Sequence, residues 1–258
     1  MTTALITGAS SGIGASYARR LAARGYDLTL VARSTAKLED LGAELSGLHG
    51  TRVDILTADL TDASQLGRVE ERLRSGAAID LLVNNAGDSL AGTFTTAQPA
   101  DLDRLIKLNV TAPTLLASAA VGGMVQRGQG AIINVGSVVG LLPEYFAGIY
   151  SATKSYILTF SQGLGAEVGP KGVYVQAVLP AATRTEIWDR AGVDVNSLQN
   201  VMEVDDLVDA ALAGFDRKEA VTIPPLGELG LWEALEKARF GLAPGFSGTP
   251  AERYRTTV

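Results

Sequence analysis

Residues 4–14 read ALITGASSGIG, and this stretch decides the fold. It begins with an apolar run typical of a buried strand and continues into three closely spaced glycines, Gly8, Gly12 and Gly14, before a helix predicted near residues 13–24. Glycines between a strand and a helix allow a tight turn whose backbone N–H groups approach a pyrophosphate at the helix N-terminus. The turn predicts a dinucleotide site, although a Gly-rich turn alone also fits an ordinary flexible loop.

The rest of the chain repeats this alternation of apolar runs and helix-length segments. Nearly continuous Val, Ile and Leu runs predict strands buried on both faces, as in parallel sheets covered by helices on each side. We therefore expect an α/β fold with a doubly wound, mostly parallel sheet of the Rossmann type. The predicted strands are 4–6, 27–32, 53–57, 79–83, 131–135, 173–178 and 220–223, and the predicted helices are 13–24, 36–45, 63–74, 99–126, 150–168, 204–215 and 228–240.

Length and composition narrow the class of protein. The 258 residues predict a single dinucleotide-binding and catalytic domain over 1–258, with 183–200 as a substrate lid and 228–258 as a C-terminal extension. The formal net charge of -6, with scattered basic residues, disfavours a nucleic-acid partner. There is no cysteine and only one histidine, so no metal site is expected.

No targeting or membrane segment is apparent in the sequence. No cationic leader precedes the apolar run that begins at Thr3. The longest apolar stretch, 111–125, is shorter than the ~20 residues needed to cross a bilayer. We therefore expect a cytoplasmic protein with no membrane partner.

Arg33 indicates which dinucleotide binds. In this type of fold an acidic residue usually ends the second strand and binds the ribose 2′-hydroxyl. Arg33 stands at that point in the run LVARS, and a guanidinium there can bind a 2′-phosphate and stack on adenine. We expect NADP(H), with NAD as the other option. The alternative interpretation is an ordinary solvated arginine at a strand end.

Several motifs together resemble those of the short-chain dehydrogenase/reductase family. The first turn matches the family's Thr-Gly-x-x-x-Gly-x-Gly, and residues 84–87 match its Asn-Asn-Ala-Gly. The family's usual Pro-Gly is replaced by Pro180-Ala181, a departure beside the expected nicotinamide position. The resemblance covers about residues 3–223. It implies cofactor contacts from Gly8, Ser10, Ser11, Gly12, Ile13, Gly14, Arg33, Asp59, Leu60, Asn85, Ala86, Gly87, Tyr150, Lys154, Pro180 and Thr185.

The same resemblance implies four catalytic residues. Ser137, followed by Tyr150 and Lys154, matches the family's Ser and Tyr-x-x-x-Lys, and Asn109 falls where the family keeps a helix-kinking asparagine. By resemblance, Lys154 would also hold the nicotinamide ribose, and Asn109 would hold a water that relays protons. The alternatives are a buried aromatic with a satisfied hydroxyl, a strand-end cap and a simple helix kink.

Elementary chemistry supports these roles. Residues i and i+4 share a helix face, so Tyr150 and Lys154 project into one space. A free phenol has a pKa of about 10, and a nearby ammonium is expected to lower it toward the working pH. Tyr150 would then exchange a proton with the substrate oxygen, while Ser137 orients and polarises that oxygen.

These observations predict an NADP(H)-dependent carbonyl reductase or secondary alcohol dehydrogenase acting on a hydrophobic ketone, aldehyde or alcohol. Apolar side chains on two segments are candidates for the substrate wall, and core packing is the alternative for each of them. The other open functions are a non-catalytic dinucleotide-binding sensor and a related epimerase or dehydratase that recycles its nicotinamide. The wall candidates are Val139, Leu141, Leu142, Tyr145, Phe146, Ile187, Trp188 and Met202.

Two helices are candidates for self-assembly. Family members commonly pair through the helices that correspond here to about 112–124 and 151–167, so the resemblance implies a homodimer or homotetramer. Small side chains on these helices would permit close packing between copies, or would instead pack against the sheet. They are Ala117, Ser118, Ala119, Ala120, Ala152, Ser161 and Gly165.

Overall fold

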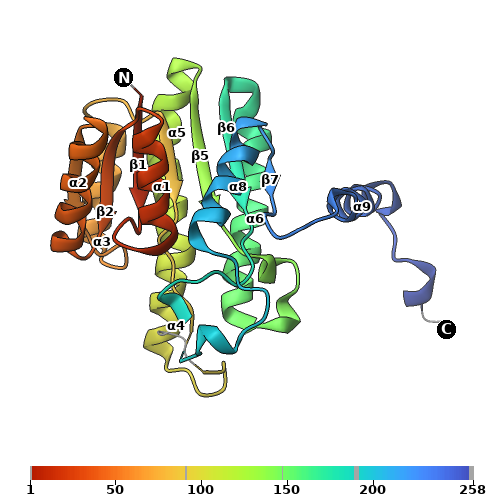
Figure 1. Cartoon of the computed structure of the whole chain (residues 1–258). Coiled ribbons are helices and arrows are strands. Elements are labelled where there is room, and N and C mark those ends of the chain that lie inside the picture. Colours follow the sequence, from red (N-terminus) through yellow and green to blue (C-terminus); the bar gives the residue numbers. More distant parts are fainter. Residues whose placement is uncertain (1, 91, 147, 189–191, 256–258) are drawn as a thin grey trace. The chain divides into compact units, whose positions relative to one another are not determined.

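The computed structural model describes residues 2–90, 92–146, 148–188 and 192–255. Within these residues, seven parallel strands form one sheet in the order β3-β2-β1-β4-β5-β6-β7 (Figure 1). The order reverses between β1 and β4, which makes this the switch point of a doubly wound sheet. The predicted fold class is therefore confirmed. The strands are β1 (Thr3–Thr7), β2 (Asp27–Ala32), β3 (Val53–Thr57), β4 (Leu81–Asn84), β5 (Gly130–Val135), β6 (Val173–Val178) and β7 (Val221–Thr222).

Helices cover both faces of the sheet. One face carries α1, α2 and α8, and the other carries α3, α5 and α6. Their starts follow the local sequence; for example, the Asp62 side chain accepts a hydrogen bond from the Gln65 backbone N–H and so caps α3. The helices are α1 (Gly12–Ala23), α2 (Thr35–His49), α3 (Ala63–Arg74), α4 (Pro99–Ile106), α5 (Ala112–Arg127), α6 (Gly148–Val168), α8 (Val204–Asp216) and α9 (Leu229–Phe240).

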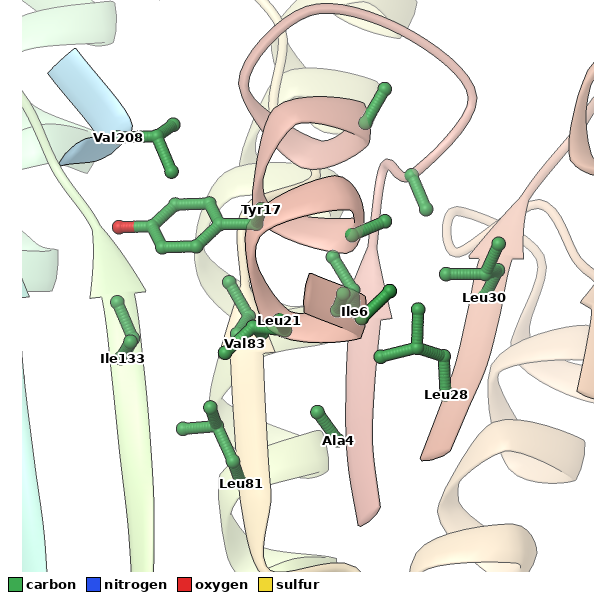
Figure 2. Close-up of a cluster of buried hydrophobic side chains, with 14 of the residues drawn as sticks. Ala4, Ile6, Tyr17, Leu21, Leu28, Leu30, Leu81, Val83, Ile133 and Val208 are labelled. Carbon is green, nitrogen blue, oxygen red and sulfur yellow. The ribbon is translucent and has the colours of Figure 1, made fainter. Parts of the chain in front are cut away.

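The core lies in two layers, one on each side of the sheet. Successive strand residues point to opposite faces, so Ala4 and Ile6 join the layer under α1, whereas Leu5 joins the layer under α5. Figure 2 shows the first layer, in which the Tyr17 ring of α1 lies between the sheet and Val208 of α8. Full burial of both strand faces explains why the sequence shows continuous apolar runs instead of alternation.

The predicted helix at 99–126 is interrupted. It consists of α4, a π-helical turn at Lys107–Thr111 and α5. Among the described residues, the combined stretch Pro99–Arg127 is the one helix long and apolar enough to cross a membrane, with a mean hydropathy of 1.4 over its 18-residue window. Its side chains include buried members of the core under α5, such as Leu116 and Met124, as expected for the core helix of a globular fold. The expected absence of a membrane partner stays a prediction.

The chain divides into two compact units, Met1–Pro225 and Leu226–Val258. The first contains the whole sheet. The second contains α9, which has no buried residue, and its described part has several exposed large apolar side chains. The second unit corresponds closely to the expected C-terminal extension at 228–258; the prediction of a single domain over the whole chain stays untested.

Candidate active site

One cavity of about 410 Å³ lies where the carboxyl ends of the strands meet. Its walls come from the segments that follow β1, β2, β3, β4, β5 and β6, so it spans the switch point of the sheet. Ligands of open α/β sheets bind in this crevice. The wall includes all but two of the predicted site residues: Gly8, Ser10, Ser11, Gly12, Ile13, Arg33, Asp59, Leu60, Asn85, Ala86, Gly87, Ser137, Tyr150, Lys154, Pro180 and Thr185.

The glycine turn after β1 is closed by contacts that only glycine allows. Gly8 has a φ of 67°, and a Cβ on Gly14 would overlap the carbonyl oxygen of Gly8. The Asn85 side chain donates hydrogen bonds to the carbonyl oxygens of Thr7 (2.9 Å) and Gly8 (3.3 Å). Gly14 does not line the cavity. It lies in the first turn of α1, where the lack of a side chain lets the helix approach the Gly8 carbonyl and the Asn85 side chain.

The far end of the cavity fits the adenosine half of a dinucleotide. Arg33 is exposed at the end of β2 and has no hydrogen bond or salt bridge to another described residue. Lys37 lines the same wall and lies 3.4 Å from a carboxylate oxygen of Glu186. Burial would raise the pKa of Asp59, but hydrogen bonds from Thr61 and the charge of Arg33 bring that pKa below its ordinary value. A glycine cradle with a free guanidinium beyond it suits a pyrophosphate and a 2′-phosphate.

The other end of the cavity holds the phenol, hydroxyl and ammonium groups. Tyr150 and Lys154 lie one turn apart on α6, and the Lys154 Nζ is 5.6 Å from the centroid of the Tyr150 ring. Lys154 Nζ also donates to the Val135 carbonyl oxygen at 3.1 Å. Ser137, two residues after the end of β5, donates to the Pro180 carbonyl oxygen at 3.2 Å. The structure thus brings three of the four predicted catalytic side chains to one wall.

The expected lowering of the Tyr150 pKa is wrong for the protein alone. Burial and the nearby charge of Asp88 raise the pKa of the Tyr150 phenol above its ordinary value. Burial also lowers the pKa of Lys154 to about 8. The reason is that Lys154 is buried and Tyr150 is half-buried at the cavity wall, so the cost of removing charge from water outweighs the attraction between ammonium and phenolate.

Asn109 lies behind the cavity wall, in the middle of the π-helical turn. Its Oδ1 accepts a hydrogen bond from the Asp88 N–H (3.0 Å), and its Nδ2 donates to the Asp88 carbonyl (2.9 Å) and to Thr153 Oγ1 (3.1 Å). A Cβ on Gly87 would lie 3.4 Å from Asn109 Oδ1 and 3.6 Å from Lys154 Nζ, so both side chains flank this glycine. Asn109 thus lies in a π-helical interruption of the predicted helix, and the predicted kink and water relay stay predictions.

The model of the short-chain dehydrogenase family matches residues 2–196. This chain belongs to the short-chain dehydrogenase family. The match includes the glycine turn, residues 84–87 and the Ser137, Tyr150 and Lys154 group, which confirms the resemblance found in the sequence.

Solved structures similar to this short-chain dehydrogenase extend over almost its whole length. A short-chain dehydrogenase from Sphingobium yanoikuyae in complex with NADPH is 56% identical, with a TM-score of 0.97, and the match covers 99% of this chain and 100% of that one. A bulky-bulky ketone specific alcohol dehydrogenase from Comamonas testosteroni is 49% identical, with a TM-score of 0.93 and 99% of both chains covered.

More distant curated relatives carry other names. The very-long-chain 3-oxoacyl-CoA reductase of Bos taurus is 36% identical over 198 residues, which is 72% of this chain and 63% of that protein. The 17-beta-hydroxysteroid dehydrogenase type 3 of Rattus norvegicus is 33% identical over 184 residues, covering 70% and 60%. This short-chain dehydrogenase therefore spans 60–63% of the length of these two relatives in its matches.

The substrate wall of the short-chain dehydrogenase agrees only in part with the sequence analysis. Val139, Phe146, Ile187 and Trp188 line the cavity, whereas Leu141, Leu142 and Met202 do not, and the side chain of Tyr145 lies outside the described part. The expected lid at 183–200 includes residues 189–191, which lie outside the described residues, so lid movement stays a prediction.

Sequence reasoning missed several cavity residues, among them Asp88, Ser89 and Arg104. Asp88 and Ser89 follow the Asn-Asn-Ala-Gly motif directly, and a charged residue at that buried point could have marked the site. Arg104 has no such signal, because only the fold brings α4 to the end of β4.

Proposed function

We propose that this chain is an NADP(H)-dependent carbonyl reductase and secondary alcohol dehydrogenase for hydrophobic ketones. The single observation that carries the proposal is the cavity in which Tyr150, Lys154 and Ser137 share one wall with the glycine turn and Arg33. A proton donor beside a dinucleotide cradle has no use in a sensor that only binds the cofactor, so this set favours turnover.

The cofactor is NADP(H). The residues suited to holding it are the glycine turn at the pyrophosphate, Arg33 and Lys37 at the 2′-phosphate, and the wall around Pro180 and Thr185 at the nicotinamide. When bound, the nicotinamide supplies or accepts the hydride at the carbonyl carbon.

The side chains of the protein supply the proton and the orientation. In reduction, the Tyr150 hydroxyl donates its proton to the carbonyl oxygen as the carbon gains a hydride, which gives the alcohol; oxidation runs in reverse. The Ser137 hydroxyl donates a hydrogen bond to the same oxygen and holds it near Tyr150. Lys154 places a positive charge close to the Tyr150 ring and stabilises the phenolate left after proton transfer.

Aromatic residues beside Tyr150 support a hydrophobic substrate. The Phe146 ring lies 5.3 Å from that of Tyr150 and 6.3 Å from that of Trp188, measured between centroids. Val139 and Ile187 extend this apolar wall. Such a surface suits a ketone with bulky apolar substituents, in line with the substrate named for the similar Comamonas testosteroni enzyme.

The test uses Tyr150→Phe. We expect it to abolish NADPH consumption with a panel of bulky aryl ketones and a 3-oxoacyl thioester, since the carbonyl oxygen loses its proton donor. Its NADPH dissociation constant, measured by fluorescence, should stay within about twofold of wild type, because no cofactor phosphate contacts Tyr150 in this scheme. Full activity in the variant would contradict the assignment. No net NADPH consumption by the wild type would favour a sensor or an enzyme that recycles its nicotinamide.

We further propose a cytoplasmic homodimer or homotetramer. Exposed small residues on α5 and α6, Ser118 and Ala152, support close approach of a second copy. Ala117, Ala119, Ala120 and Ser161 are buried within the protein, which agrees with the alternative that they pack inward.

A further inference from the structure

Asp88 places a buried carboxylate in the wall of the cavity. It follows β4 and the Asn-Asn-Ala-Gly motif, its side chain is 8% exposed, and the reaction proposed above does not use its charge. A buried carboxylate is costly unless it is paired and hydrogen-bonded. Arg104 of α4 provides the pair, with its Nη1 2.9 Å from Asp88 Oδ2, and the backbone N–H of Ser89 donates to Asp88 Oδ1 at 3.0 Å.

The Asp88 backbone is linked to the helix turn that carries Tyr150. Asn109 bonds both the N–H and the carbonyl of Asp88, and also donates to Thr153 Oγ1 at 3.1 Å. Thr153 Oγ1 in turn donates to the Tyr150 carbonyl oxygen at 2.7 Å. A continuous series of contacts therefore leads from Arg104, through Asp88 and Asn109, to the residue that donates the proton.

The charges around Tyr150 come from three elements. Lys154 lies beside it on α6, Asp88 approaches from the end of β4, and Arg104 reaches Asp88 from α4. Arg33, Lys37, Asp59 and Glu186 also line this cavity. Asp88 is the charged residue that raises the pKa of Tyr150, so it favours the protonated phenol. Arg104 opposes this effect by neutralising the carboxylate.

We propose that Asp88 and Arg104 are a positioning pair that holds the Asn109 side chain, and with it the helix turn that carries Tyr150, in place, and that the two charges act on the Tyr150 phenol in opposite senses. This inference rests on the proposed reductase function. The opposite charges of the two residues give the proposal a specific test. Removing the Asp88 charge should lower the proton affinity of Tyr150, and removing the Arg104 charge should raise it.

The first experiment measures kcat/KM for alcohol oxidation with NADP against pH. Oxidation needs the phenolate, so the rate rises with pH through the apparent pKa of Tyr150. Asp88→Asn should move this rise to lower pH by about one unit, and Arg104→Gln should move it to higher pH by about one unit. Arg104→Lys should restore the wild-type profile. Shifts in one direction for both variants, or no shift, would overturn the proposal.

The matched control is Asp103→Asn. Asp103 lies on α4 next to Arg104, is exposed, and pairs with Lys107 outside the cavity wall. The Asp103→Asn substitution removes one negative charge, as Asp88→Asn does, but from the helix that carries Arg104. It should leave the pH profile unchanged. A shift as large as that of Asp88→Asn would mean that the effect comes from net charge and would overturn the proposal.

A second readout does not depend on turnover. The Asp88 amide is hydrogen-bonded to Asn109, so its hydrogen exchange in the NADP-free protein reports how firmly the loop is held. Arg104→Gln should speed this exchange by about tenfold or more, with Asp103→Asn unchanged. If the wild type reduced none of the ketones, the proposed function would be contradicted. The hydrogen-exchange measurement would still test the positioning role. Unchanged exchange of the Asp88 amide in Arg104→Gln would overturn that role.

Discussion

At the residue scale, Arg33 carries the choice between the two nicotinamide dinucleotides. It lines the cavity at the end of β2, is exposed, and has no salt bridge to another described residue. Arg33→Asp should weaken NADPH binding on the order of 100-fold, because a charge-assisted contact becomes a repulsion. NADH binding should improve by comparison. Fluorescence titration with both cofactors measures this, with Arg52→Asp, exposed and outside the cavity wall, as the control. An unchanged cofactor ratio would mean that Arg33 is not involved.

Burial of the charged Lys154 side chain lowers the free energy of unfolding of the protein. Its pKa is lowered to about 8 in the folded protein from 10.5, so the unfolded chain binds more protons between these values and stability rises with pH across this interval. Below pH 8 the full cost of burying the ammonium remains, at most about 3 kcal/mol. The hydrogen bond to Val135 offsets about 1 kcal/mol of it.

Lys154→Met should therefore raise the free energy of unfolding by roughly 1–2 kcal/mol at neutral pH while abolishing activity. The gain over wild type should shrink above pH 8, vanish at about pH 9 to 9.5 and change sign at higher pH, because the wild type gains about 1.4 kcal/mol per pH unit in this interval. Urea unfolding of both proteins at several pH values measures it. The exposed Lys171→Met serves as the control and should show no such pH dependence. A variant less stable than wild type at neutral pH would contradict this account.

At the scale of elements, the turn between β1 and α1 has no room for a side chain at Gly14. Gly14→Ala should lower the stability by about 2 kcal/mol or more and weaken NADPH binding at least tenfold, since the new Cβ overlaps the Gly8 carbonyl and opens the cradle. Gly163→Ala is the matched change: it lies exposed in α6 with open space around it and should add up to about 1 kcal/mol. Equal behaviour of the two variants in thermal unfolding would show that the turn tolerates a Cβ.

The sequence analysis predicted secondary-structure elements more accurately than contacts between side chains. Strands buried on both faces leave continuous apolar runs, so each predicted strand is present within a few residues. The π-helical turn at 107–111 could be placed only through the resemblance, because the pattern around it fits one continuous helix. Arg104 could not be assigned to the site, since its partner Asp88 lies on another element. The pKa of Tyr150 was predicted in the wrong direction because burial cannot be read from a four-residue spacing.

At the scale of the whole molecule, folding should depend on residues 1–225 alone. The buried residues of the described chain all precede Pro225. A chain ending at Pro225 should therefore still unfold in one cooperative transition. Its NADPH affinity should also be unchanged. Loss of cooperative unfolding in calorimetry would contradict this expectation.

The second unit is expected to contribute to self-association. Its exposed large apolar side chains are a surface that water disfavours and that another copy could cover. Light scattering should show a dimer or tetramer for the full chain and a smaller species for the chain ending at Pro225. A monomeric full chain would contradict the proposed assembly. The large apolar side chains in question are Leu229, Leu231, Leu235, Phe240, Leu242, Phe246 and Tyr254.

The cavity takes its walls from the ends of six successive strands, and this has a consequence during synthesis. Parallel pairing joins segments far apart in the sequence, which makes it slow to form. On the ribosome, the emerging polypeptide cannot capture NADPH until the segment around Pro180 has left the exit tunnel and β6 has docked beside β5. Nascent chains arrested before that point should be inactive and accessible to proteases, even though they already contain the complete glycine turn.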